Sequence, residues 1–169
     1  MRFLITLSVF LALSAVATAQ TSPCACCAAE YRQFDFWLGY WEAFTPAGQL
    51  AGTNDIVLLQ DSCIVQENWV SAGGGFTGTS YNYYDRQRRL WNQVWIDNQG
   101  GSLVLQGRRA GNQMILSGTS RNQNGDLVKN RVTWTANEDG TVRQLWETSA
   151  DGTSWSVAFD GLYKRKGKE

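Results

Sequence analysis

The sequence predicts an all-β fold, a closed antiparallel up-and-down barrel of about ten strands with a short 3-10 or helical plug before strand one. Short segments rich in Val, Ile, Thr, Trp and Tyr alternate with clusters of Gly, Asn and Asp, and a period of two residues dominates. The short connectors force neighbouring strands to run antiparallel. Closure removes the two exposed edges that an open meander would leave. A two-layer sandwich is the alternative, but it needs longer crossovers.

Residues 1–19 have the features of a secretory signal peptide. Arg2 gives a positive start, an apolar run covers residues 3–16, and Ala-Thr-Ala at residues 17–19 is a small-residue cleavage site. The run is shorter than the roughly 20 apolar residues that a membrane-spanning helix needs. We therefore expect cleavage after Ala19, a secreted or periplasmic protein, and no membrane span in the mature chain.

Residues 20–33 are expected to form an N-terminal arm that carries Cys24, Cys26 and Cys27, and the fourth cysteine is Cys63. Disulfides are the default in an oxidising compartment. Adjacent cysteines hardly bond each other without strain, so Cys63 is expected to pair with one of the other three and to fix the arm to the domain. A thiolate metal site is the alternative, but the spacing matches no closed zinc site and no metal is expected.

The barrel domain is expected to span residues 34–166. Its connectors are turn sequences rich in Gly, Asn and Asp. The predicted strands are Gly39–Phe44, Gly52–Gln60, Ile64–Ser71, Thr77–Asp85, Leu90–Asp97, Ser102–Arg109, Gln113–Arg121, Leu127–Ala136, Thr141–Thr148 and Trp155–Arg165.

Alternation along four of these strands assigns side chains to two faces. The groups that share a face are Val65, Glu67 and Trp69; Trp91, Gln93 and Trp95; Val128, Asn130, Val132 and Trp134; and Trp155, Val157, Phe159, Gly161 and Tyr163. On the two strands that carry the first two groups, neither face is wholly apolar. Some of the inward surface must therefore be polar, or the outer face carries apolar bulk.

The stretch "FDFWLGYWEAF" gathers aromatic side chains immediately before and within the first strand. Phe34, Phe36 and Trp37 are expected to close one end of the barrel from a short 3-10 turn. Gly39 lets the backbone kink into the strand, and Trp41 enters the base of the core. This Gly-x-Trp spacing resembles the signature of the calycin superfamily, which contains lipocalins, fatty-acid-binding proteins and nitrobindin-like barrels.

With the downstream "YNYYD", the same stretch also resembles a family of uncharacterised secreted bacterial proteins, a domain of unknown function with a lipocalin-like barrel. The lipocalin resemblance implies that a basic residue near the chain end, Arg165 or Lys164, packs over Trp41. The connection after the first strand is too short for the lid helices of fatty-acid-binding proteins, so the chain looks most like nitrobindin. Nitrobindin-like proteins hold haem through a histidine, and this sequence has none. Neither haem nor another cofactor is therefore expected.

Charge and composition exclude several classes of function. The formal net charge is zero, and the tail "KRKGKE" is the only charge run, so nucleic acid is not an expected partner. Without histidine there is no Ser-His or Cys-His nucleophile and no ordinary catalytic zinc. The oligomeric state is left open by the sequence.

Glu67 is the candidate for acid–base chemistry. It alternates with Val65 and Trp69, and burial against indoles would raise its pKa. With a tyrosine, it would suit an isomerase, cyclase or hydratase acting on a small molecule. In the alternative, Glu67 pairs with an arginine of a neighbouring strand or lies outside.

The eight tryptophans point first to a binding protein rather than an enzyme. A ten-strand barrel is wide enough to hold a small apolar or amphipathic molecule as well as side chains. Candidate lining residues are Trp69, Tyr81, Tyr83, Trp91, Gln93, Trp95, Asn130, Trp134 and Trp146, and Asn82 and Arg143 would add hydrogen bonds. The register decides whether Tyr81 and Tyr83, or Asn82 and Tyr84, face inward. A solid barrel that acts through its outer surface is a further alternative.

Overall fold

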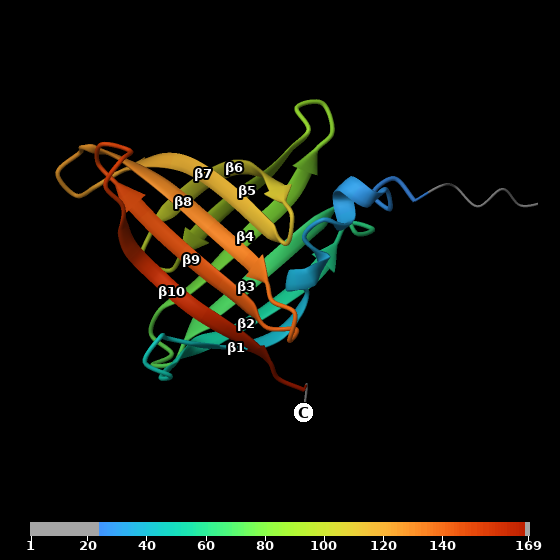
Figure 1. Ribbon diagram of the computed structural model, residues 1–169, viewed down its shortest axis with the longest axis horizontal. Coiled ribbons are helices and arrows are strands. Elements are labelled where there is room, and N and C mark those ends of the chain that lie inside the picture. Colours follow the sequence, from blue (N-terminus) through green and yellow to red (C-terminus); the bar gives the residue numbers. More distant parts are fainter. Residues whose placement is uncertain (1–23, 168–169) are drawn as a thin grey trace, which may run out of the picture.

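Residues 24–167 are described by the structure, a computed structural model, and the predicted signal peptide lies outside them. Ten antiparallel strands form one closed barrel, in which every strand pairs with its neighbours in sequence and β1 pairs with β10. Figure 1 shows β10, in red, running beside β1. The predicted all-β closed barrel is confirmed.

The strands have nearly the predicted bounds. They are β1 (Gly39–Phe44), β2 (Leu50–Leu59), β3 (Ile64–Ser71), β4 (Thr77–Asp85), β5 (Leu90–Asp97), β6 (Ser102–Ala110), β7 (Gln113–Arg121), β8 (Leu127–Ala136), β9 (Val142–Ser149) and β10 (Ser156–Arg165). β2 begins two residues earlier than predicted because a register shift after Ala43 pairs Phe44 with Leu50.

Two 3-10 helices, η1 (Ala29–Arg32) and η2 (Asp35–Trp37), precede β1 and lie at one end of the barrel (Figure 1). Phe34 and Trp37 are fully buried there and stack with their ring centroids 5.0 Å apart. Trp134 of β8 packs edge-on against Phe34 at 5.2 Å. Phe36 is half-buried beneath the guanidinium of Arg109. Aromatic side chains therefore fill this end of the barrel, as predicted.

The start of β1 depends on a glycine. Gly39 has a φ of +129°, and a Cβ at this position would lie 2.6 Å from Nη1 of Arg165. The Arg165 guanidinium lies over the Trp41 ring at 4.5 Å, whereas Lys164 lies over Phe44 instead. Of the two basic residues expected near Trp41, Arg165 makes the contact. Trp41 is fully buried and donates a 2.8 Å hydrogen bond from Nε1 to the carbonyl of Trp37.

Two disulfides hold the N-terminal arm. Cys26 is bonded to Cys63 in the β2–β3 turn, and Cys24 is bonded to Cys27 within the arm. The expected link from the arm to the domain is therefore present, and Cys26 provides it. Both bonds are compatible with an oxidising compartment. No helix within residues 24–167 is long and apolar enough to cross a bilayer.

Candidate ligand-binding site

The barrel interior contains a cavity of about 340 Å³. It lies toward the end opposite the aromatic plug, because its lining comes from the last residues of β3 and β5, the first half of β10 and the β3–β4 loop. Its aromatic lining residues are Trp69, Phe76, Trp95, Trp146, Phe159 and Tyr163. Its polar lining residues are Glu67, Ser71, Gln93, Asp97 and Gln144. Ala51, Leu103, Val132 and Ala158 complete the wall.

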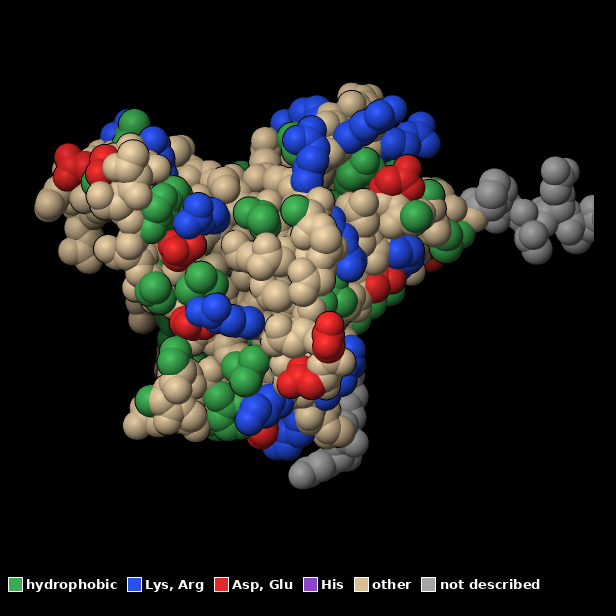
Figure 2. Space-filling view, viewed as in Figure 1, with side chains coloured by type: hydrophobic (Ala, Val, Ile, Leu, Met, Phe, Trp, Pro, Cys, Tyr) green, Lys and Arg blue, Asp and Glu red, His purple; other side chains and the backbone are tan. Residues whose placement is uncertain are grey.

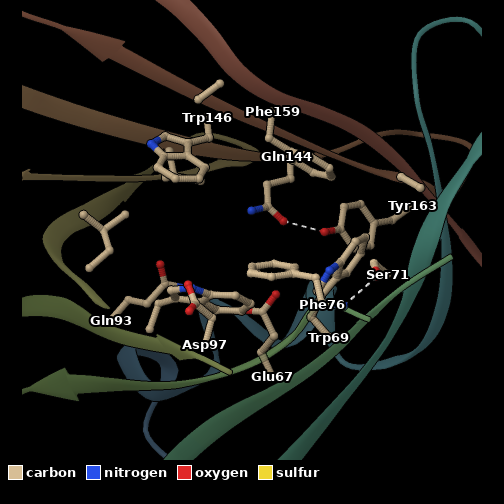
Figure 3. A pocket seen from close by; sticks show the side chains of 15 residues that line it. Glu67, Trp69, Ser71, Phe76, Gln93, Asp97, Gln144, Trp146, Phe159 and Tyr163 are labelled. Carbon is tan, nitrogen blue, oxygen red and sulfur yellow. Dashed lines mark hydrogen bonds between the residues drawn. The ribbon is translucent and has the colours of Figure 1, made fainter. Parts of the chain in front are cut away.

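The two carboxyl groups of the lining lie on one wall, and two of the aromatic rings lie on the opposite wall. Figure 3 shows Glu67, Gln93 and Asp97 on one side of the cavity and Trp146 and Phe159 on the other. The first three residues belong to β3 and β5, which also supply Trp69 and Trp95, and the other two belong to β9 and β10. A molecule in the cavity would contact both kinds of side chain at once.

A glycine on the neighbouring strand gives the Trp95 ring its place. Gly78 of β4 pairs with Asp97 of β5, two residues beyond Trp95 and on the same face of the sheet. A Cβ on Gly78 would lie 2.1 Å from Cζ2 of Trp95, so the indole rests directly on the glycine backbone. Its ring centroid lies 6.5 Å from that of Phe76, which comes from the β3–β4 loop.

Glu67 lies at the floor of the cavity and is buried with only 4% of its surface exposed. Its Oε1 accepts a 2.8 Å hydrogen bond from Asn54, and its Oε2 accepts one of 2.6 Å from Ser80. Asn82 and Gln93 in turn donate to the Ser80 hydroxyl, at 2.9 and 3.3 Å. Within residues 24–167, the carboxyl group accepts hydrogen bonds from the neutral donors Asn54 and Ser80 and from no charged one.

Burial raises the pKa of Glu67 to about 7, although the hydrogen bonds from Ser80 and Asn54 work in the opposite direction. A carboxyl group with this pKa is present in both protonation states at neutral pH. It can accept a proton from a bound molecule, donate one, or carry a full charge once a cation lies beside it.

Tyr163 of β10 is the second titratable group at the floor. Its hydroxyl donates a 2.6 Å hydrogen bond to Oε1 of Gln144, drawn in Figure 3. Burial raises the pKa of Tyr163 well above 10, and the neighbouring charge of Glu67 raises it further. Tyr163 therefore stays protonated and acts as a hydrogen-bond donor at ordinary pH.

Basic side chains lie on the outside of the barrel. Figure 2 shows Lys and Arg side chains on this face of the molecule, and Arg86, Arg88 and Arg89 are exposed on the β4–β5 hairpin. Among residues 24–167, neither Lys nor Arg lines the cavity, whereas the carboxyl groups of Glu67 and Asp97 do. The interior is therefore acidic and aromatic, although the chain as a whole is neutral.

Four of the predicted ligand-binding residues line the cavity together with Glu67. They are Trp69, Gln93, Trp95 and Trp146. All four occupy the inward positions that alternation predicts or allows on their strands. Glu67 is neither exposed nor paired with an arginine, so the alternative arrangement predicted for it is wrong.

Three further predicted residues point inward but lie away from the cavity. Trp134 packs in the plug, and Trp91 contacts Phe34 and donates to Gln33 at 3.1 Å. Asn130 is buried and accepts a 3.0 Å hydrogen bond from Trp146, whose orientation it holds. Trp91 and Trp134 therefore pack at the plugged end of the barrel, while the cavity lies toward the opposite end.

Tyr81 and Tyr83 do not line the cavity, which corrects the prediction made for them. They lie on the outer face of β4 with 42% and 39% of their surface exposed. The register of β4 turns Asn82 and Tyr84 inward, because Asn82 pairs with Gln93 of β5. Arg143 is also outside, where its guanidinium forms an ion pair with Asp160 at 2.7 Å.

Trp155 likewise differs from the prediction that it shares a face with Phe159 and Tyr163. A register shift between Val157 and Phe159 moves the preceding residues to the outer face. Val157 is 63% exposed, and Trp155 stacks against the outer guanidinium of Arg131 at 4.2 Å. The alternation pattern carries no sign of this bulge.

Sequence reasoning missed several lining residues. The sequence places Phe159 and Tyr163 on one face of their strand but gives them no role in binding, and period two could have added Gln144 and Asp97. Phe76 belongs to a loop, where no periodicity indicates the direction of a side chain.

Comparison with models of known protein families gives no match. A search of curated proteins likewise gives no match.

Proposed function

We propose that this chain is an exported, lipocalin-like barrel that binds a small apolar or amphipathic molecule in its tryptophan-lined cavity. The proposal is carried by one observation, the cavity of about 340 Å³ with largely aromatic walls and a few polar groups at its floor. Small-molecule sites generally combine these two kinds of lining. Since one water takes about 30 Å³ in the liquid, the cavity suits a ligand with on the order of ten to fifteen non-hydrogen atoms.

Apolar burial supplies most of the expected affinity. A ligand that buries about 200 Å² of apolar surface gains about 5 kcal/mol at roughly 25 cal/mol per Å², before the cost of association. The rings that line the site are already packed: Trp69 contacts Phe159 at 5.9 Å and Tyr163 at 6.4 Å between ring centroids. A preformed site loses little entropy on binding, so we expect dissociation constants of roughly 0.1–1 mM for well-fitting molecules, which correspond to about 4–5 kcal/mol.

Two features support the lipocalin-like assignment. Arg165 lies over Trp41 and against Gly39 at the closed end of the barrel, which is the contact that the resemblance implies. Residues 45–49 alone connect β1 to β2, so the chain has no room for lid helices at that point. Export is supported by the two disulfides and by the apolar segment at residues 3–16.

Fluorescence of the cavity tryptophans tests the proposal. Quenching by a panel of small aromatic and aliphatic molecules is expected for the wild-type protein and is lost in Leu103→Trp, because that substitution fills the cavity from β6. Val104→Trp is the matched control: Val104 is the next residue, is 54% exposed, and lies on the opposite face of the same strand. Equal quenching in both variants, or no response to any member of the panel, would contradict internal binding.

Glu67 supports a second candidate, an isomerase, cyclase or hydratase that works on the bound molecule. Its pKa of about 7 and its place in an aromatic cavity beside Tyr163 suit proton transfer. Small cyclic ketones in D₂O test this activity by NMR: enzyme-dependent deuterium exchange at carbon should disappear in Glu67→Gln. The absence of exchange across such a panel would leave binding as the function.

A further inference from the structure

We propose that the cavity selects an organic ammonium ion with an apolar body over neutral or anionic molecules of the same shape. The inference rests on the proposed function, because it names the chemical class of ligand for the same cavity. It is carried by two carboxyl groups and several aromatic rings in the lining, where the described chain places no Lys or Arg.

Glu67 is the first partner for the ammonium group. Each of its oxygens accepts one hydrogen bond, from Asn54 and from Ser80, and a carboxylate offers about four acceptor positions. Room for a charge-assisted hydrogen bond therefore remains on the side that faces the cavity. A bound cation would also favour the ionised form of Glu67, which burial disfavours in the empty protein.

The polar network around Glu67 has more acceptors than donors. Oδ1 of Asn54 and Oδ1 of Asn82 are buried, and no residue of the described chain donates a hydrogen bond to either. The amide nitrogen of Gln93 donates a hydrogen bond to the Ser80 hydroxyl, and the Gln93 side chain lines the cavity. An additional donor at this floor complements the network, whereas an additional acceptor does not.

Asp97 is the second carboxyl group and lies nearer the mouth, at the end of β5. Its Oδ1 accepts the backbone N–H groups of Gln99 and Gly101 at 2.9 and 2.8 Å, which fixes the side chain in the β5–β6 turn. Within residues 24–167, no donor is hydrogen-bonded to Oδ2. Asp97 thus presents negative charge along the path into the cavity and attracts a cation before it reaches Glu67.

The aromatic walls favour the same class of ligand. The faces of indole, phenyl and phenol rings attract cations, most strongly where water is excluded. Trp69, Trp146, Phe159 and Tyr163 all line the space opposite or beside Glu67. An alkylammonium ion would bury its hydrocarbon body and its charge against the same rings, which a carboxylate could not do.

Calorimetric titration of the mature protein with three probes of one shape tests the proposal: phenylbutylamine, phenylbutanol and phenylbutyrate. Their bodies are alike and only the head group differs. We expect the amine to bind at least about tenfold more tightly than the alcohol, since a hydrogen bond to a charged group exceeds a neutral one by roughly this factor. The carboxylate should bind most weakly, because it would lie beside Glu67 and Asp97.

The three probes separate the two proposals. If the alcohol or the carboxylate binds as tightly as the amine, the ammonium inference is wrong and binding in the cavity stands. If none of the three binds, the ammonium inference and binding of molecules of this size both fail.

Substitution at the floor provides a second test. Glu67→Gln should abolish most of the advantage of the amine over the alcohol, and retained affinity for phenylbutanol would show that the cavity is intact. Glu147→Gln is the matched control, because Glu147 faces outward and pairs with Arg131 at 2.9 Å. If Glu67→Gln does not fold, Asp97→Asn replaces it and should reduce the advantage by a smaller factor. If the amine keeps its full advantage over the alcohol in the variant that folds, whether Glu67→Gln or Asp97→Asn, the proposal is wrong.

Affinity should also depend on pH in one direction. The advantage of the amine rises from pH 5 to pH 8 as Glu67 ionises, and Glu67→Gln removes most of this rise. The other titratable groups in the lining are Tyr163 from β10 and Asp97 from β5, while β2 and β4 face Glu67 with the neutral side chains of Asn54 and Ser80. An advantage that stays constant over this range would contradict a role for Glu67.

Discussion

The hydroxyl of Ser80 donates a 2.6 Å hydrogen bond to Oε2 of Glu67 inside the barrel. The two residues face each other across the β3–β4 ladder, so the contact is set by strand register. It stabilises the carboxylate in a place where burial disfavours the charge, and Asn54 does the same from β2. The pKa of Glu67 therefore depends on these two hydrogen bonds and on burial, and a change in either should shift it.

Replacement of Ser80 by Ala should raise the pKa of Glu67 above about 7, because one hydrogen bond to the ionised form is lost. The free energy of unfolding should fall by about 1–3 kcal/mol, since buried groups lose a partner. NMR titration of the labelled carboxyl group and denaturant unfolding measure these effects. Ser117→Ala, at an exposed position of β7, is the control and should change neither quantity. An unchanged titration in Ser80→Ala would contradict the proposed role of the contact.

Stability should decrease with rising pH because of Glu67. Its folded pKa of about 7 lies above the ordinary value of 4.5, so its favourable contribution is fully present below pH 4.5 and is lost as pH rises through about 7. The difference between these two pKa values corresponds to about 3 kcal/mol in the free energy of unfolding. Unfolding experiments between pH 4.5 and 8 measure the slope.

Glu67→Gln should remove this part of the slope and Glu147→Gln should keep it. The pKa of Asp35 is also raised by burial, so the comparison between the two variants isolates Glu67 better than the slope of the wild-type protein does. Equal slopes in the wild-type protein and in Glu67→Gln would mean that the carboxyl group is not buried as described.

Much of this account could be predicted from the sequence. Period two and short turns predict ten strands with bounds within two residues of those observed, since local alternation and turn chemistry determine where strands begin and end. Alternation with Val65 and Trp69 makes Glu67 a candidate for an inward position, but the sequence also allows it to lie outside, and only the structure decides between the two. The plug of Phe34 and Trp37 follows from the clustering of large aromatic side chains before the first strand.

Other parts depend on information that no local pattern contains. Tyr81 and Tyr83 face outward because of the pairing register of β4, and a register one residue away would turn them inward. Trp155 is outside because of a bulge in β10, and the sequence pattern does not predict this bulge. Phe76 reaches the cavity from a loop, where only the complete fold determines its direction.

The two disulfides should contribute unequally to stability. Cys26 and Cys63 are 37 residues apart and Cys24 and Cys27 only 3, so the former bond restricts a much longer loop of the unfolded chain. The loop-entropy relation gives a difference of about 2 kcal/mol. Denaturant unfolding of two double variants, Cys26→Ala with Cys63→Ala and Cys24→Ala with Cys27→Ala, measures it. Equal losses of stability would mean that the arm is fixed mainly by contacts other than the Cys26–Cys63 bond.

Gly78→Ala should disturb the cavity without altering a lining residue. A methyl group at Gly78 would lie 2.1 Å from the Trp95 ring, so the indole must move from its place on β4. We expect weaker ligand binding by about tenfold and a shift in tryptophan emission, because roughly 1.4 kcal/mol of ring contact is lost. Gly75→Ala is the control, since nothing lies within 4 Å of a Cβ at that loop position. Unaltered emission and affinity in Gly78→Ala would show that Trp95 does not lie on the glycine.

The most direct measurement of the central claim is a crystal structure of the mature protein grown with saturating phenylbutylamine. The account predicts the phenyl ring among Trp69, Trp95 and Trp146, with the ammonium group within hydrogen-bond distance of Glu67. A cavity closed by its own side chains, or a probe bound only on the outer surface of the barrel, would contradict it.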